Sequence, residues 1–218
     1  MSEFSCYLIY YICMYLCTCI CMCVPLLSAL NHYSSRYYQA TPPPNKHASD
    51  YEPQGWFEDQ LALVGNINAS GHVIGPVAES DWLNVVPKGI GDMLVWIAER
   101  YENPPLYITE NGVDAPGEAE TPLPAVLNDT FRVEYFQGYL DSVFEAKDTR
   151  GVNVQGYFAW SLLDNFEWND GYHCRFGLHY VDYSSPDLTR YRKKSAEFIT
   201  KYIQKYTMRM ENVARQIS

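Results

Sequence analysis

The stretch "YITENGVDAP", residues 107–116, decides how this chain is expected to fold. An uncharged, strand-like run passes directly into a carboxylate, Glu110, which is followed by Asn111 and Gly112. With the residues before it, the run "PLYITE" at 105–110 predicts a short buried strand. Asn-Gly pairs favour turns, so Glu110 is either an ordinary acid that opens a turn or a functional group at the end of a strand.

Amphipathic patterns predict three helices, over residues 88–101, 129–147 and 195–206. The second follows a polar start, so Asn128 or Asp129 is expected to cap it. The apolar residues that recur at helical spacing, and are expected to be buried, are Ile90, Leu94, Ile97 and Tyr101, then Val133, Phe136, Leu140, Val143 and Phe144, then Phe198, Ile199, Tyr202, Ile203 and Tyr206.

Strands and helices are expected to alternate along the chain. "VQGYFAWSLL" at 154–163 predicts another buried strand, and "LNHYSSRYY" at 30–38 is interpreted as the first one. Alternation of this kind is typical of parallel βα units, an α/β fold. In such units the ligand site lies at the carboxyl ends of the strands, which is where Glu110 falls.

The bulk composition fits one globular domain. The 218 residues carry a net charge of -10, and 47% of them are hydrophobic. This acidic balance offers no basic surface for phosphates, so no nucleic acid partner is expected. The loop from 39 to 55 is too rich in proline for regular structure.

The first 29 residues differ from the rest, so a boundary is placed between 1–29 and 30–218. Six of the seven cysteines lie in the first 23 residues, without the histidines or paired spacing of a metal site. The run from Cys6 to Leu30 is uncharged and long enough to cross a bilayer core of about 30 Å. It is interpreted either as a signal anchor with membrane contact through 6–30 or as an artefactual start joined to an older sequence.

The stretch from 157 to 183 combines aromatic rings with acids. Trp160, Glu167, Trp168 and Phe176 occur where a strand should pass into a loop. A sugar site needs these residue types, because a pyranose face stacks on a ring while a carboxylate accepts hydrogen bonds from neighbouring hydroxyls. Core packing alone would not favour the acids.

These motifs resemble glycoside hydrolase family 1, the retaining β-glucosidases, and are most similar to the plant branch. "YITENG" and "GYFAWSLLDNFEWNDGYHCRFGLHYVDY" carry the resemblance. Further pieces follow in the family order: "LNHYSSRYY", "VIGP", "WLNVVPKGI", "DTFRVEYFQGYL" and "RYRKKSAEF". The resemblance implies a β-glucoside or glucose-type ligand and a TIM (β/α)8 barrel fold.

The resemblance also implies roles for individual residues. Glu110 matches the nucleophile that attacks the anomeric carbon, and Tyr33 matches the tyrosine that orients it. The residues that match the substrate-binding positions are Trp160 at the floor of the glucose subsite, Glu167 and Trp168 at the glucose hydroxyls, Phe176 as an aromatic wall, and Trp82 at the aglycone.

One part of the family pattern is missing. The acid/base glutamate of a T-x-N-E-P motif should stand about 5 to 5.5 Å from the nucleophile, but the sequence contains no N-E-P. A complete barrel takes about 250 residues, so this chain is expected to hold the C-terminal portion, about three βα units. We therefore expect little activity from the chain alone, and an exposed barrel edge through which it could self-associate.

Three hypotheses remain open from the sequence. The chain is a β-glucosidase by descent, a non-catalytic sugar-binding or partner module, or a membrane-anchored interaction protein. The sequons at Asn68 and Asn128 are candidate glycosylation sites and agree with a secretory route, although Asn128 also suits a helix cap. No cofactor and no metal are expected, because retaining glycosidases need neither.

Overall fold

The computed structural model describes residues 28–40 and 62–217, with side chains described up to residue 208. The cysteine-rich segment before residue 28 and most of the proline-rich loop lie outside the described residues. The expectations that rest on those segments therefore stay predictions.

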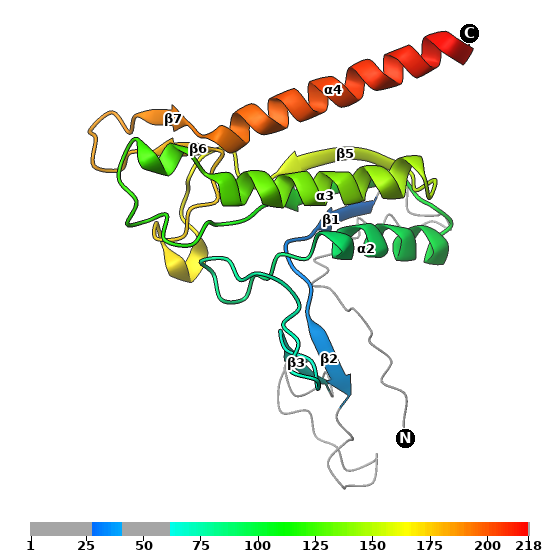
Figure 1. The fold of residues 1–218 in the computed structure, drawn as a ribbon, viewed down its shortest axis with the longest axis horizontal. Coiled ribbons are helices and arrows are strands. Elements are labelled where there is room, and N and C mark those ends of the chain that lie inside the picture. The colour runs from blue at the N-terminus through cyan, green and yellow to red at the C-terminus, as the bar shows by residue number, and fades with distance from the viewer. Residues whose placement is uncertain (1–27, 41–61, 218) are drawn as a thin grey trace, which may run out of the picture.

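Three parallel strands form the central sheet, in the order β1-β4-β5. Helices alternate with them, as the alternating pattern predicts, and α4 packs against α3 and extends away from the sheet (Figure 1). The bounds of these elements are β1 Ser28–Asn31, α2 Pro87–Arg100, β4 Leu106–Asn111, α3 Thr130–Asp148, β5 Val154–Ala159 and α4 Lys194–Ile217. Within the described residues β1 and β5 each pair with β4 alone, so this sheet is open at both edges.

Two antiparallel hairpins accompany the sheet. The first joins β2 (Tyr37–Ala40) to β3 (Ala62–Gly65), and Figure 1 shows it projecting from the main body. The second joins β6 (His179–Val181) to β7 (Arg190–Arg192) just before α4. Short 3-10 turns at 125–127 and 168–170 complete the described elements.

The single strand expected over 30–38 is wrong. β1 ends at Asn31, and the chain leaves the sheet before β2 begins at Tyr37. Between them the Ser34 hydroxyl donates to the Asn84 carbonyl at 3.1 Å and accepts from the Asn84 N–H at 2.8 Å. These bonds tie the segment to a distant loop, and such a tertiary contact leaves no mark in the local pattern.

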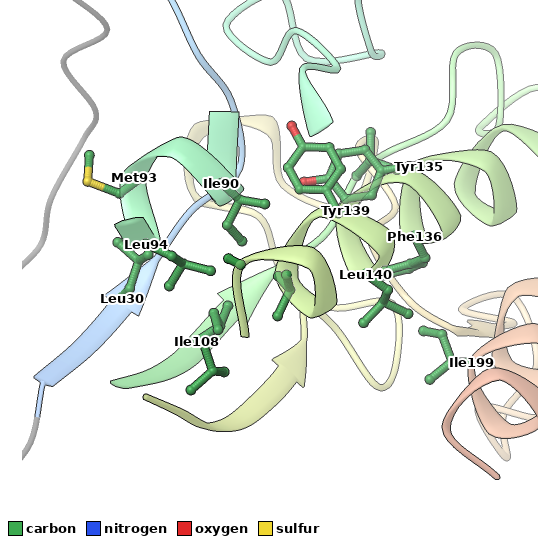
Figure 2. Close-up of a cluster of buried hydrophobic side chains, with 14 of the residues drawn as sticks. Leu30, Ile90, Met93, Leu94, Ile108, Tyr135, Phe136, Tyr139, Leu140 and Ile199 are labelled. Carbon is green, nitrogen blue, oxygen red and sulfur yellow. The ribbon is translucent and has the colours of Figure 1, made fainter. Parts of the chain in front are cut away.

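The core lies between the helices and the sheet, as Figure 2 shows. Leu30 and Ile108 point from the strands toward α2 and α3, in keeping with the period-two alternation of a strand that is buried on one face. The helical side chains that meet them include Ile90, Leu94, Phe136, Tyr139 and Leu140, and all are buried.

All three predicted helices are present, but α4 continues to Ile217, well past the predicted end at residue 206. Tyr101 lies just past the end of α2 and is exposed, and Ile203 on α4 is also exposed rather than buried. Asp129 stands at the N-cap of α3 but makes no capping bond. Its carboxylate instead accepts hydrogen bonds from the Ser195 N–H at 2.9 Å and hydroxyl at 2.5 Å, which fasten the start of α4 to the start of α3.

The expected membrane segment over 6–30 is only partly visible. Its last three residues, 28–30, belong to β1 and pair with β4, so they form part of the sheet and β1 begins before the boundary placed at residue 30. No helix in the described part of the chain is both long and apolar enough to span a bilayer.

Candidate active site

A bulge at the end of β4 sets the direction of Glu110. Along β4 the buried positions alternate through Leu106 and Ile108, so an unbroken strand would turn Glu110 toward the helices. The register shifts between Ile108 and Asn111 against β5, and again where Asn31 meets Glu110. Because the extra residue moves Asn111 onto the buried face, Glu110 is left half-buried at the strand end.

Glu110 is held by two residues that directly follow β1. The Tyr33 hydroxyl donates to Glu110 Oε2 at 2.6 Å, and the Glu110 carbonyl accepts from the His32 N–H at 3.0 Å. Burial raises the pKa of Tyr33 far above its ordinary value, and the bond to Glu110 raises it further. Tyr33 therefore stays protonated and serves as a hydrogen-bond donor to the carboxylate.

Asn111 belongs to the strand and does not form an Asn-Gly turn. Its side chain is fully buried and donates to the His32 carbonyl at 2.6 Å and to the Tyr135 hydroxyl at 2.8 Å. Its Oδ1 accepts from the Tyr157 hydroxyl at 2.6 Å. This network joins β4, β5, α3 and the residue after β1 behind Glu110, so the turn interpretation of "ENG" is wrong.

Gly112 allows β4 to approach the end of β5. A Cβ at this position would lie only 1.7 Å from the Trp160 carbonyl oxygen, so no larger residue fits without backbone movement. The Trp160 N–H donates to the Asn111 carbonyl at 2.8 Å in the same place. The sequence of the motif therefore brings Trp160 next to the strand end that carries Glu110.

Trp160 and Glu167 contact each other directly. The indole Nε1 donates to Glu167 Oε1 at 3.1 Å. Burial raises the pKa of Glu167 above its ordinary value; the bonds from Trp160 and Asn165 oppose this, whereas the charge of Glu110 adds to it.

Two of the three remaining aromatic candidates contact Tyr33, and the third does not. The Phe176 and Trp82 rings meet the Tyr33 ring edge-on, with centroids 6.1 and 5.9 Å away. Phe176 is buried, whereas 41% of the Trp82 surface is exposed. The indole of Trp168 is 86% exposed, and we find no hydrogen bond or ring contact between it and the described residues.

The glycosylation candidates occupy loops. Asn68 Oδ1 accepts from the backbone N–H groups of Ser70 and His72 at 3.0 and 2.9 Å. Asn128 is exposed and accepts from Lys194 Nζ at 3.1 Å. Modification of either asparagine stays a prediction.

A buried ion-pair network lies behind this region, and the sequence patterns do not reveal it. Arg132 donates to Asp129 at 2.6 Å and pairs with Glu118, which also pairs with Lys193. Asp164 joins Lys193 at 3.0 Å and Arg175 at 2.7 Å. The six residues that we call the ion-pair network are Glu118, Asp129, Arg132, Asp164, Arg175 and Lys193.

Arg132 connects the network to the candidate site. Its guanidinium donates to the Val113 carbonyl at 2.9 Å and to the Arg175 carbonyl at 2.5 Å. Val113 follows Gly112, and Arg175 precedes Phe176. Burial would lower the pKa of Arg132, but the charges of Glu118 and Asp129 raise it above its ordinary value. The guanidinium therefore stays charged while it joins the end of β4 to the Phe176 segment.

Known proteins match this chain over most of its length. The family model of glycosyl hydrolase family 1 matches residues 25–208. Beta-glucosidase 11 of rice (Oryza sativa subsp. japonica) is 43% identical over 81% of this chain and 32% of its own length. Beta-glucosidase 42 of Arabidopsis thaliana is 43% identical over 80% and 34%. The chain thus spans about a third of these relatives.

Solved structures agree with the sequence match. A GH1 beta-glucosidase from the fungus Humicola insolens, in complex with glucose, superposes with a TM-score of 0.72 at 40% identity, over 81% of this chain and 35% of that one. A mutant of rice Os3BGlu6 beta-glucosidase, in a covalent complex with Glc, gives 0.71 at 36% identity, over 79% and 35%. The chain therefore belongs to glycosyl hydrolase family 1.

Proposed function

We propose that this chain carries the nucleophile side of a retaining β-glucosidase site, on about three βα units from the C-terminal portion of a (β/α)8 barrel. The observation that carries the proposal is the 2.6 Å hydrogen bond from Tyr33 to Glu110 at the carboxyl end of β4. A tyrosine that stays protonated orients one carboxylate oxygen and leaves the other to attack an anomeric carbon.

The chemistry expected of Glu110 is the first half of a double displacement. Its oxygen would form an ester bond to the anomeric carbon as the bond to the aglycone oxygen breaks. A second carboxyl group normally protonates that leaving oxygen and later activates water. The sequence lacks the T-x-N-E-P motif that bears this group in the family. Loss of general acid/base help costs about 10² to 10⁴ in rate, so turnover by the chain alone should be very slow.

The proposed ligand is a β-glucoside or glucose. Its support is the contact between Trp160 and Glu167, which joins a flat ring to a carboxylate as a pyranose requires. Trp168 would add a second ring at the edge of this site. The matched Humicola insolens enzyme is in complex with glucose and the rice Os3BGlu6 mutant in a covalent complex with Glc, which supports a ligand of this kind here.

A leaving group that needs no proton makes the nucleophile testable on its own. We would incubate the purified chain with a 2-fluoro-β-glucoside of dinitrophenol and examine its peptides by mass spectrometry. The expected result is a slowly formed glycosyl ester on Glu110, missing in Glu110→Gln and unchanged in the exposed control Glu134→Gln. Folded chain that acquires no label would contradict the nucleophile role. Rapid turnover of an ordinary aryl glucoside would contradict the low activity.

A non-catalytic sugar-binding module is the second candidate. The observation that favours it is the largely exposed Trp168, which follows Glu167 in the chain, because exposed rings next to carboxylates suit sugar binding without chemistry. It predicts that glucose quenches tryptophan fluorescence in the Glu110→Gln variant as in the wild type. A flat titration at millimolar glucose would exclude this candidate.

Self-association forms part of the proposal because both edges of the central sheet are open in the described residues. Unpaired strand edges and the apolar faces of parallel sheets recruit other chains. Sedimentation velocity at rising protein concentration should reveal dimers or larger species. A monomer at all concentrations would exclude this part of the proposal.

A further inference from the structure

Trp82 stands in the turn of a tight hairpin, residues 76–85. The Val85 N–H donates to the Pro76 carbonyl at 2.7 Å, and the Ala78 N–H donates to the Leu83 carbonyl at 3.0 Å. The Leu83 N–H also donates to the Ser80 carbonyl at 3.1 Å, which closes a four-residue turn with Trp82 as its third residue. The position of Ser80 therefore determines the position of the Trp82 backbone.

Ser80 is fastened to Asp114, which follows Glu110 by four residues. The Ser80 N–H and hydroxyl both donate to Asp114 Oδ2, at 2.8 and 2.6 Å. Asp114 is fully buried, and burial raises the pKa of its carboxyl group. Burying a carboxylate is costly unless hydrogen bonds compensate it, and here a single serine supplies two of them.

The hairpin is tied to the nucleophile at a second point. The Trp82 carbonyl accepts from Arg36 Nη2 at 2.5 Å, and the Trp82 ring meets the edge of Tyr33, the residue bonded to Glu110. Asp114 thus holds the Trp82 turn through Ser80, and Arg36 and Tyr33 hold it at a second place near the end of β4. A turn held at both points cannot move without breaking one of these contacts.

We propose that Asp114 is a positioning residue that holds the Ser80–Leu83 turn on the end of β4 and so fixes the Trp82 ring relative to Glu110. The part of this inference that concerns ligands rests on the proposed function and on the family resemblance, which matches Trp82 to the aglycone position. Asp114 itself touches no reacting atom. Its effect is on which aglycone the site accepts, not on the attack by Glu110.

The first experiment measures the Trp82 ring without any ligand. The chain has five tryptophans, so the fluorescence of Trp82 must be isolated. It is obtained by subtracting, from the emission spectrum of each variant, the spectrum of the same variant with Trp82→Phe. Ser80→Ala and Asp114→Asn should shift this difference spectrum to the red and raise its quenching by acrylamide. Ser80→Thr keeps the hydroxyl and should restore the wild-type values, and the exposed control Ser70→Ala should leave them unchanged.

A purely stabilising contact gives a different result. In that case Ser80→Ala would lower the urea midpoint while the folded variant kept the wild-type Trp82 spectrum and quenching, and the proposal would be overturned. Unfolding curves for each variant identify the conditions in which the chain is folded. If Asp114→Asn fails to fold, the comparison of Ser80→Ala with Ser80→Thr decides the matter.

The second experiment compares two ligands that differ in the aglycone. Fluorescence titration of Ser80→Ala should show an affinity for 4-nitrophenyl β-glucoside that is about three- to ten-fold weaker, the size of effect expected from the loss of the hydroxyl hydrogen bond to Asp114. Its affinity for glucose should be unchanged. Equal losses for both ligands would overturn the aglycone role. If the wild type binds neither ligand, the proposed function fails, whereas the positioning role is still decided by the Trp82 spectra.

Discussion

Replacing Arg132 by methionine tests whether the ion-pair network supports the candidate site. The guanidinium is fully buried and serves two carboxylates and two backbone carbonyls. Methionine fills much of the same space but leaves Glu118 and Asp129 without this cation. Removing one partner of a buried pair costs about 3 to 5 kcal/mol, because an uncompensated charge remains inside the protein. This is a large share of the roughly 5 to 15 kcal/mol that stabilises a typical domain.

Urea unfolding measures the cost. The control is Lys88→Met, which removes an exposed pair with Asp92 and should cost no more than about 0.5 kcal/mol. The double variant Arg132→Met with Glu118→Met removes charges of both signs, so its loss should be smaller than the sum of the single losses by about 0.5 to 3 kcal/mol. A loss in Arg132→Met no larger than that in Lys88→Met would refute the reasoning, and so would additive losses in the double variant.

Three further predictions follow from the site. Tyr33→Phe removes the hydroxyl that is hydrogen-bonded to Glu110 and should lower the free energy of unfolding in urea by about 0.5 to 1.5 kcal/mol. It should also slow the glycosyl labelling of Glu110, and unchanged labelling would contradict the orienting role of Tyr33. Gly112→Ala should prevent folding in expression and circular dichroism tests, because its Cβ would lie 1.7 Å from a carbonyl oxygen, whereas Gly65→Ala, with no contact under 3.8 Å, should fold. Glu167→Gln should become more stable relative to the wild type as pH rises from about 4 to 7.

The sign of the last effect comes from the raised pKa of Glu167. Above the ordinary value of 4.5 the unfolded chain loses this proton, while the folded chain keeps it until a higher pH. The folded state therefore binds more protons in that window, and the free energy of unfolding falls as pH rises through it. Glutamine has no proton to lose. A stability difference that stays constant across the window would contradict the raised pKa.

Periodic features of the fold could be predicted from the sequence. In the helices around Leu94 and Leu140, apolar residues recur every three to four positions over several turns, and β4 is a short apolar run. These local patterns are enough to predict the three elements. The break after Asn31 could not be predicted in this way. It depends on hydrogen bonds between Ser34 and Asn84, which lie far apart in the sequence.

The sequence predicts which residues form the candidate site, but it does not predict how they are arranged in space. Motif resemblance pointed to Glu110 and Tyr33, and the structure brings them into hydrogen-bond contact. The bulge turns Asn111, instead of Glu110, to the buried face of the sheet. It could not be predicted, because the residue types around an extra residue in a strand do not differ from those of a regular strand. Arg132 looks like a surface charge on a helix until the fold brings its partners to it.

We propose that Glu110 is a nucleophile without its acid/base partner, and the mass of the peptide that contains Glu110 is the best test of that role. After incubation with the 2-fluoro-β-glucoside of dinitrophenol, we expect one glycosyl group on Glu110, together with very slow turnover of 4-nitrophenyl β-glucoside. A folded chain that stays unlabelled would contradict the claim. Fast turnover that disappears in Glu110→Gln would show that the chain has an acid/base group of its own.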